Sequence, residues 1–248
     1  MKRIIDLIIR IYLSPLKLNT RLALYVKGKI LPYEEHYVAT IDTIRRRFGE
    51  IQGCILDIGA FDGDSSIYLA KSFPHAPIFA FEPNPNAFEM ALKNTRGLAN
   101  ITVHNVALSE TEGVAELHVT ENSVSSSLYM PTSDSKLGLT RKVAVKVVTL
   151  DLFCKDLRQI LLLKLDAQGA ELGILRSGKK ALQHTYLVLT EMLNSDAYVG
   201  NCYYYELDKL LRENGFQLHA IFSNYNYEGV KYFDALYINR AFSGILQE

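Results

Sequence analysis

The chain has 248 residues, with 27 basic and 27 acidic residues and 48% hydrophobic residues. This length suits one large domain or a domain with an extension, and the composition is that of an ordinary globular protein. The formal net charge of zero argues against nucleic acid as the main partner, because phosphate binding normally needs a basic excess. The three cysteines show neither zinc spacing nor a disulfide framework, so we expect a reducing, cytoplasmic compartment.

The N-terminal part is predicted to be a helical extension, residues 1–50, followed by a second domain, residues 51–248. Its first thirty residues are rich in Lys and Arg, and their apolar run is too short and too charged to span a membrane. A basic amphipathic helix of this kind can lie on an anionic membrane surface, which would give residues 1–30 a peripheral membrane contact. The commoner alternative is a helix that packs on its own domain or on a partner subunit. Apolar residues at helix spacing predict a further helix over Glu34–Phe48.

Short apolar runs alternate with amphipathic segments from Gly53 onward. Strands are predicted at Cys54–Ile58, Pro77–Phe81, Ile101–Val106, Ile160–Leu165, Tyr186–Thr190, Gln217–Phe222 and Phe233–Ile238, and helices at Ser65–Phe73, Asn86–Thr95, Leu172–Leu175 and Tyr204–Asn214. Two half-buried strands, Val114–Val119 and Lys142–Val148, flank a serine-rich stretch and predict an antiparallel β insertion. The repeated strand–helix units predict an α/β fold with a doubly wound sheet.

A glycine turn follows the first strand, with Gly59 after Asp57 and Gly63 at the start of the next helix. Such a turn holds a nucleotide-like cofactor in open α/β sheets, but the dinucleotide pattern has three glycines and its middle one is absent here. Asp57 and Asp62 would repel a pyrophosphate and suit an ammonium group. Glu82 stands where an acid accepts hydrogen bonds from a ribose. S-adenosylmethionine (SAM), which has a ribose and an ammonium but no phosphate, fits better than NAD.

Four sequence blocks stand at the ends of predicted strands: Leu56-Asp57-Ile58-Gly59-Ala60 through Gly63, Phe81-Glu82-Pro83-Asn84-Pro85, Asn105-Val106-Ala107-Leu108-Ser109 through Gly113, and Leu163-Lys164-Leu165-Asp166-Ala167-Gln168-Gly169-Ala170-Glu171. In these blocks and their order the chain resembles the FkbM family of SAM-dependent methyltransferases. The resemblance implies a Rossmann-like class I methyltransferase sheet of seven strands, the last antiparallel. It also implies O-methylation of a hydroxyl on a sugar, a glycan or a related metabolite.

The resemblance further implies how SAM is held. The glycine turn would surround the methionine end, Glu82 would bind the ribose, and Asn105 and Ala107 would border the adenine. The implied cofactor-binding residues are Asp57, Gly59, Ala60, Phe61, Gly63, Glu82, Pro83, Asn84, Asn105 and Ala107. Many members have Asn after the alanine of the turn; this chain has Phe61, so the contact of that asparagine is missing.

Methyl transfer to a hydroxyl needs an aligned acceptor and a base that takes its proton. Asp166, at the carboxyl edge after a buried strand, is the first candidate, and Glu191, predicted to end the next strand, is the second. Lys164, the third candidate for the catalytic site, is unusual in a buried strand, and we expect an ion pair with Asp166, Glu171 or Glu191. The same network could serve only to fix the edge of the sheet. No cluster has metal-ligand spacing, so no metal is expected, although Asp166 and Glu191 could share a divalent ion.

Tyrosines crowd the C-terminal third of the chain, and aromatic faces with nearby amides suit a sugar acceptor. They are Tyr198, Tyr203, Tyr204, Tyr205, Tyr225, Tyr227 and Tyr232. The plainer alternative is that these rings pack on the sheet. Tyr205 and Lys209 have the spacing of a short-chain dehydrogenase pair, which a helix rich in both residues produces by chance.

Two rival functions remain open at this point. One is a non-catalytic SAM-fold protein that docks on a partner through its basic N-terminal helix. The other is an NAD(P)-dependent sugar-modifying enzyme, which cofactor binding would separate from a methyltransferase at once. The identity of the acceptor and the oligomeric state do not follow from the sequence.

Overall fold

The computed structural model describes residues 32–48, 51–222 and 230–242. The chain divides into two compact units, Met1–Arg46 and Arg47–Glu248. Helix α3, Pro32–Phe48, covers the helix predicted before the first strand. The predicted membrane-surface segment, residues 1–30, lies outside the described residues. Within the described ranges, no helix is both long and apolar enough to cross a membrane.

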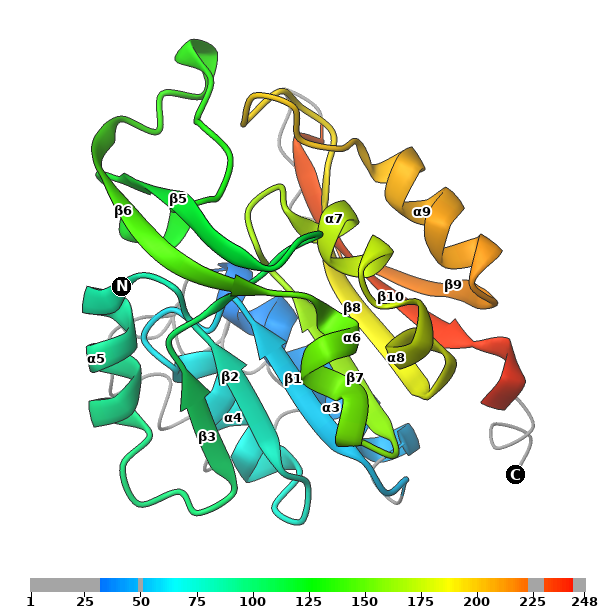
Figure 1. Ribbon diagram of the computed structural model, residues 1–248. Coiled ribbons are helices and arrows are strands. Elements are labelled where there is room, and N and C mark those ends of the chain that lie inside the picture. Colours follow the sequence, from blue (N-terminus) through cyan, green and yellow to red (C-terminus); the bar gives the residue numbers. More distant parts are fainter. Residues whose placement is uncertain (1–31, 49–50, 223–229, 243–248) are drawn as a thin grey trace, which may run out of the picture. The chain divides into compact units, whose positions relative to one another are not determined.

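The central sheet has seven strands in the order β3-β2-β1-β7-β8-β10-β9 (Figure 1). Their bounds are β1 Cys54–Ile58, β2 Ile78–Phe81, β3 Ile101–His104, β7 Ile160–Leu165, β8 Thr185–Leu193, β9 Phe216–Phe222 and β10 Tyr232–Asn239. Strand β10 runs antiparallel to both neighbours, and the other pairs are parallel. This arrangement confirms the predicted class I methyltransferase fold. The strand order reverses between β1 and β7, and ligands of such sheets bind at the carboxyl ends beside that point.

The central strands β1 and β7 are buried along their whole length. Their apolar runs suit this position, because a parallel strand between two helical layers contacts other residues on both faces. Asp57 and Lys164 are the charged exceptions, one on each strand, and both are buried. Buried charges need partners, and both of these residues lie near the carboxyl ends of their strands.

Helices cover the sheet at the places where the chain crosses from strand to strand. Their bounds are α4 Asp64–Ser72, α5 Pro85–Asn94, α6 Leu150–Phe153, α7 Glu171–Arg176, α8 Lys179–Gln183 and α9 Tyr204–Glu213, with the 3₁₀ turn η3 at Cys154–Asp156. Helices α6 and α8 were not predicted, because a helix of one turn is too short to show the helical period in its sequence. The Asn84 side chain caps α5 by accepting a hydrogen bond from the Asn86 amide at 3.1 Å.

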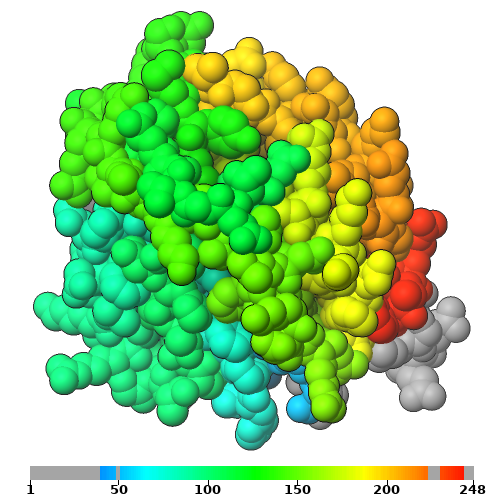
Figure 2. Space-filling view, in the orientation of Figure 1, coloured from blue at the N-terminus to red at the C-terminus, as the bar shows by residue number. Residues whose placement is uncertain are grey.

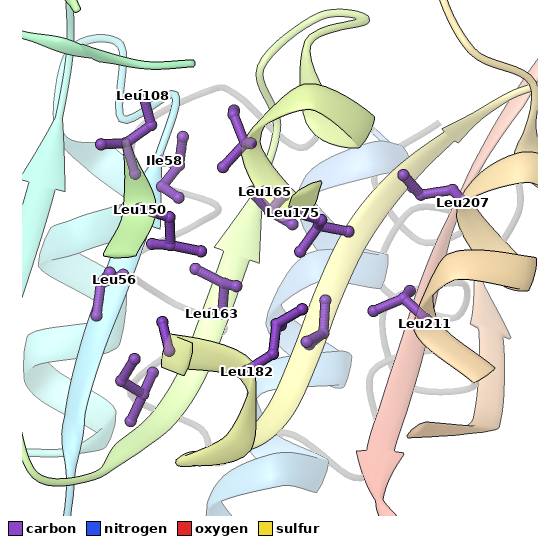
Figure 3. Close-up of a cluster of buried hydrophobic side chains, with 14 of the residues drawn as sticks. Leu56, Ile58, Leu108, Leu150, Leu163, Leu165, Leu175, Leu182, Leu207 and Leu211 are labelled. Carbon is purple, nitrogen blue, oxygen red and sulfur yellow. The ribbon is translucent and has the colours of Figure 1, made fainter. Parts of the chain in front are cut away.

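One hydrophobic core lies between β1, β7 and β8 and the helices α6 to α9 (Figure 3). Leu163 and Leu165 point from β7 toward Leu175 of α7 and Leu182 of α8, and all four are at most 1% exposed. Burying one such leucine contributes about 1.5–3 kcal/mol, so this layer holds β7 firmly in place. The edge of the sheet that follows β7 therefore stands on a rigid base.

A second, three-stranded sheet forms an arm with the order β4-β6-β5. Its strands are β4 Ala107–Leu108, β5 Gly113–Thr120 and β6 Leu139–Val148, with the 3₁₀ turns η1 Ser123–Ser125 and η2 Ser133–Ser135 between β5 and β6. The antiparallel insertion was predicted correctly. The strand predicted over Ile101–Val106 was too long, because the chain leaves the main sheet after His104 and joins β6 in the arm as β4.

The arm lies on the side of the sheet to which the arrowheads of β1 and β2 point (Figure 1). Its loop also contacts the segment before α9: the Thr132 amide donates to the Ala197 carbonyl at 3.0 Å, and the Val199 amide donates to the Met130 carbonyl at 2.8 Å. In the space-filling view the green arm adjoins the golden atoms of that segment (Figure 2). The arm thus connects two distant parts of the chain beside the carboxyl edge.

Candidate active site

The glycine turn after β1 has three residues with positive φ: Gly59 (80°), Phe61 (49°) and Gly63 (85°). A Cβ atom at Gly59 would overlap the carbonyl oxygen of Asp166, so only glycine allows the loops after β1 and β7 to meet. The Gly63 amide donates to the Ala60 carbonyl at 2.8 Å, and Gly63 then caps α4. The turn therefore lies directly against the residue that we predicted to be the base.

Asp57 is fully buried just before this turn. Its Oδ1 atom forms an ion pair with the Lys164 ammonium at 2.8 Å, and its Oδ2 atom accepts hydrogen bonds from the hydroxyls of Ser65 and Ser66 at 2.6 Å each. These contacts tie β1 to β7 and to the first turn of α4. The contact of Asp57 with the methionine end of SAM stays a prediction.

The predicted partners of Lys164 were wrong. We expected Asp166, Glu171 or Glu191, but the ion pair is with Asp57, because β1 and β7 pair in parallel with these two residues opposite each other. Burial disfavours the ammonium charge, but Asp57 and Asp166 outweigh it and raise the pKa of Lys164. Lys164 is therefore favoured in its charged form, and its predicted place among the catalytic residues stays a prediction.

Glu82 follows β2 directly and is buried beside the glycine turn. Its Oε2 atom accepts a hydrogen bond from the Phe61 amide at 2.9 Å, and its Oε1 atom accepts one from the Asn84 amide at 2.7 Å. The Asn105 side chain donates to the carbonyls of Glu82 and Pro83 at 2.9 and 3.1 Å. The residues predicted for the ribose and part of the adenine site are thus brought together, and Phe61 joins them through its backbone.

This arrangement fits the ribose of SAM. Burial raises the pKa of Glu82 to about 7, which marks a carboxylate with fewer donors around it than its charge requires. Each of its oxygens has a lone pair left after the two backbone hydrogen bonds, and a ribose diol would supply the missing donors. Ala107 instead lies in β4, buried in the core of the arm, so its predicted border with the adenine stays a prediction.

Carboxyl groups from three neighbouring strands converge at the carboxyl edge. Asp166 follows β7, Glu191 lies in β8, and Asp234 is paired with Glu191 across β8 and β10. The Gln168 amide nitrogen donates to Asp166 Oδ1 at 2.7 Å and to Glu191 Oε2 at 3.2 Å. Glu191 was predicted to end its strand, but β8 continues to Leu193 because β10 pairs with it that far.

Burial and mutual repulsion favour the protonated forms of Glu191 and Asp234. Burial, and then the charges of Asp166 and Glu171, raise the pKa of Glu191 well above its ordinary value. Burial and then Asp166 raise the pKa of Asp234 to about 7. A carboxyl group with a pKa near 7, such as that of Asp234, is suited to exchange a proton near neutral pH.

The loop after β7 is held by its own side chains. Glu171 is buried, and its two oxygens accept hydrogen bonds from the amides of Ala167 and Gly169 at 2.7 and 2.9 Å. Burial is the main cause that raises the pKa of Glu171 to about 7. Gln168, between these amides, has a φ of 53°. Glu171 therefore fixes the loop that carries Asp166 and Gln168.

Three further groups belong to this cluster of carboxyl groups and were not predicted as its members: Gln168, Asp234 and the hydroxyl of Tyr198. Tyr198 OH lies 2.8 Å from Gln168 Oε1, and it was predicted only as one of many acceptor-binding tyrosines. Gln168 lies inside the fourth sequence block, and that position could have singled it out. Asp234 could have been found by aligning the last strand antiparallel to the strand of Glu191.

The tyrosines before and within α9 form a small aromatic surface. The rings of Tyr203 and Tyr205 are nearly parallel, with centroids 5.6 Å apart, while Tyr204 packs on Phe233 at 5.7 Å. Tyr205 is 57% exposed. Tyr225 and Tyr227 lie outside the described residues. Among the described residues, no group of three or more His, Cys, Asp or Glu side chains has the geometry of a metal site.

Known proteins that are similar in sequence to this chain include methyltransferases. The chain is 30% identical over 159 residues to the 2-O-methyltransferase NoeI of Sinorhizobium fredii, a match that covers 59% of this chain and 65% of NoeI. It is 25% identical over 194 residues to the methyltransferase sdnD of Sordaria araneosa, covering 66% of this chain and 73% of that protein. The match to NoeI thus spans slightly less than two thirds of that relative's length.

Among solved structures, the FkbM methyltransferase of Methylobacillus flagellatus aligns with a TM-score of 0.47 at 16% identity, over 80% of this chain and 47% of that one. The family profile described as the methyltransferase FkbM domain matches residues 57–218, more than half of the chain. All four sequence blocks fall within or overlap that range. The chain therefore belongs to the FkbM family of SAM-dependent methyltransferases.

Proposed function

We propose that this protein transfers a methyl group from SAM to a hydroxyl of a sugar, a glycan or a related metabolite. The observation that carries the proposal is the convergence of Asp166 and Glu191, bridged by one amide, directly beside the glycine turn. A proton acceptor is needed for O-methylation because a neutral hydroxyl is a poor nucleophile. The 2-O-methyltransferase NoeI, at 30% identity, supports oxygen as the atom that is methylated.

SAM, when bound, supplies an electrophilic methyl group. In our proposal Glu82 accepts hydrogen bonds from the ribose, and the backbone of the turn from Gly59 to Gly63 lies along the methionine end. Asp166 orients the acceptor hydroxyl, and the Asp166–Glu191 pair takes its proton as the new O–C bond forms. Burial and the neighbouring carboxyl groups raise the pKa of Glu191, so in its ionised form this carboxylate binds a proton more strongly than an exposed one.

Aromatic side chains support a carbohydrate as the acceptor. Tyr203 and Tyr205 expose nearly parallel rings at the start of α9, in the segment that continues from Tyr198 of the site network. Flat aromatic faces suit the C–H faces of a sugar, whose hydroxyls then stay free for hydrogen bonds. We propose that this surface receives the rest of the acceptor while Asp166 receives its reacting hydroxyl.

The proposed compartment is the cytoplasm. The three cysteines are all free and buried, as is usual where thiols stay reduced. A peripheral membrane contact through residues 1–30 remains part of the proposal. Removal of residues 1–30 followed by liposome co-sedimentation tests it, and unchanged sedimentation would end it.

A labelled-methyl experiment tests the function. The purified protein is incubated with trideuteromethyl SAM and a panel of oligosaccharides, nucleotide sugars and free sugars, and the products are analysed by mass spectrometry and NMR. We expect the label on a hydroxyl oxygen of one acceptor class. SAM binding without any transfer would favour the non-catalytic rival, and binding of NAD(P) in place of SAM would favour the dehydrogenase-like rival.

A further inference from the structure

The Gln168 side chain joins the two candidate bases. Its amide nitrogen has two hydrogens, and they point to Asp166 Oδ1 at 2.7 Å and Glu191 Oε2 at 3.2 Å. One planar group therefore fixes the distance and orientation between two carboxyl groups that come from different strands.

Tyr198 sets the orientation of that amide. Its hydroxyl lies 2.8 Å from Gln168 Oε1 and 2.9 Å from the carbonyl oxygen of Ser125, and the residue is 2% exposed. Both neighbours are acceptors, and burial raises the pKa of Tyr198, so the hydroxyl keeps its single hydrogen and shares it between these two oxygens. With Oε1 facing this donor, the amide hydrogens must face the carboxyl groups.

The arm holds Gln168 from a second direction. The Ser127 hydroxyl donates to the Gln168 carbonyl at 2.6 Å, across 41 positions of the chain. Ser127 is itself fixed to β5, because its backbone exchanges two hydrogen bonds with His118 at 2.8 and 3.1 Å. Gln168 has a φ of 53°, which non-glycine residues adopt only when their surroundings impose it.

We propose that Gln168 is a positioning residue that aligns the Asp166–Glu191 pair, and that the arm keeps it in place through Ser127 and Tyr198. This inference rests on the proposed function of that pair. It gives the inserted arm a role in the reaction, because Ser127 of the arm holds the backbone of Gln168 and Ser125 of the arm contacts the Tyr198 hydroxyl that faces the amide. It also gives a reason for the positive φ of Gln168 in the loop after β7, because this loop places the side-chain amide between Asp166 and Glu191.

The electrostatic consequence is that the Gln168 N–H group favours the charged form of Glu191 and opposes the burial that raises its pKa. The other charged and titratable groups around the pair are Lys164 of β7 with Asp57 of β1, Glu171 of α7, Asp234 of β10 and Tyr198. Of these, Lys164 favours the charged form of the pair, and the carboxyl groups oppose it. Gln168 adds the donors that the carboxyl cluster lacks.

The test is a titration of the side-chain carboxyl groups by ¹³C NMR, with signals assigned through Asp166→Asn and Glu191→Gln. Gln168→Met keeps the length of the side chain and removes both donors, so we expect Glu191 to titrate about one pH unit higher. The acid limb of kcat should move by the same amount, while the KM for SAM stays unchanged. Tyr198→Phe and Ser127→Ala should move both readouts in the same direction by less.

Two matched controls separate positioning from general loss of packing. Tyr186→Phe also removes a buried tyrosine hydroxyl, whose partner Gln159 lies 3.0 Å away at the opposite end of β8. Ser135→Ala removes an arm hydroxyl that bonds only locally, to the Thr132 carbonyl at 2.7 Å. Both should leave the titration and the pH profile unchanged.

An unchanged carboxyl titration in Gln168→Met would overturn the inference, whatever happens to the rate. If the wild-type protein methylates no acceptor, the proposed function fails, but the titration still decides whether Gln168 controls the pair. If Gln168→Met does not fold, Tyr198→Phe and Ser127→Ala decide: a shift in both supports the inference, and a shift in neither contradicts it.

Discussion

The ammonium of Lys164 lies 2.8 Å from the carboxylate of Asp57, across the two strands where the order of the sheet reverses. Asp57 stands two residues before Gly59 of the cofactor turn, and Lys164 stands two residues before Asp166. One buried ion pair therefore couples the loop predicted to hold SAM to the loop that carries the candidate base. Replacing either residue of the ion pair should therefore disturb the structure that supports both loops.

Lys164→Met should cost about 3–5 kcal/mol of unfolding free energy, because it leaves a buried carboxylate without its partner. Urea unfolding measures this loss. The matched control is Lys209→Ala, which breaks an exposed ion pair to Glu213 at 4.0 Å and should cost less than about 0.5 kcal/mol. Equal losses in the two variants would show that the pair does not hold the strands together.

Gly59→Ala should destabilise the protein and abolish SAM binding, because its Cβ would overlap the Asp166 carbonyl oxygen. Gly97 is the control: its φ of 92° is similarly unfavourable for alanine, but nothing lies within 4 Å of a Cβ there. Gly97→Ala should therefore cost only about 1–2 kcal/mol and leave SAM binding intact. Thermal unfolding with and without SAM measures both effects, and normal SAM binding by Gly59→Ala would refute the close approach.

The affinity for S-adenosylhomocysteine should depend on the charge of Glu82. Burial raises the pKa of Glu82 to about 7, and ribose hydroxyls bind the ionised form better. Affinity should therefore rise with pH, by at most about tenfold per unit, and level off above about pH 7. Isothermal titration calorimetry measures it. Glu82→Gln should bind weakly and without this pH dependence; a wild-type affinity that falls with pH would remove Glu82 from the ribose site.

Glu171 should make the protein less stable as pH rises. Burial raises its native-state pKa from 4.5 to about 7, so the folded protein holds this proton more tightly than the unfolded chain does. Its contribution is complete below about pH 4.5 and is lost as pH rises to about 7, by up to about 3 kcal/mol. Denaturant unfolding across this range should give a slope that is smaller in Glu171→Gln, and identical slopes would contradict the assignment.

The fold was largely predictable because its signals are local. The all-apolar strand Ile160–Leu165 and the strand Cys54–Ile58 were placed at their observed bounds, since buried parallel strands have continuous apolar sequences. The three-stranded arm was predicted only as two strands, because the two-residue strand Ala107–Leu108 is too short to show a period.

The site was less predictable because its contacts join residues that are far apart in the chain. Pairing Lys164 with Asp57 requires the parallel register of β1 and β7, which local patterns do not contain. Ser127 reaches Gln168 only because the arm folds back over the edge of the sheet. Acids and glycines at strand ends indicated where the site lies, and the tertiary register decided which side chains meet there.

The most direct test of the proposed chemistry is single-turnover methyl transfer by Asp166→Asn, measured with labelled SAM and the acceptor that the wild-type protein methylates. Asparagine keeps the size of the side chain and cannot take a proton, so the rate should fall about 10²–10⁴-fold while the affinity for SAM stays within about twofold of wild type. A variant that transfers methyl groups at the wild-type rate would contradict the role of Asp166 in the reaction.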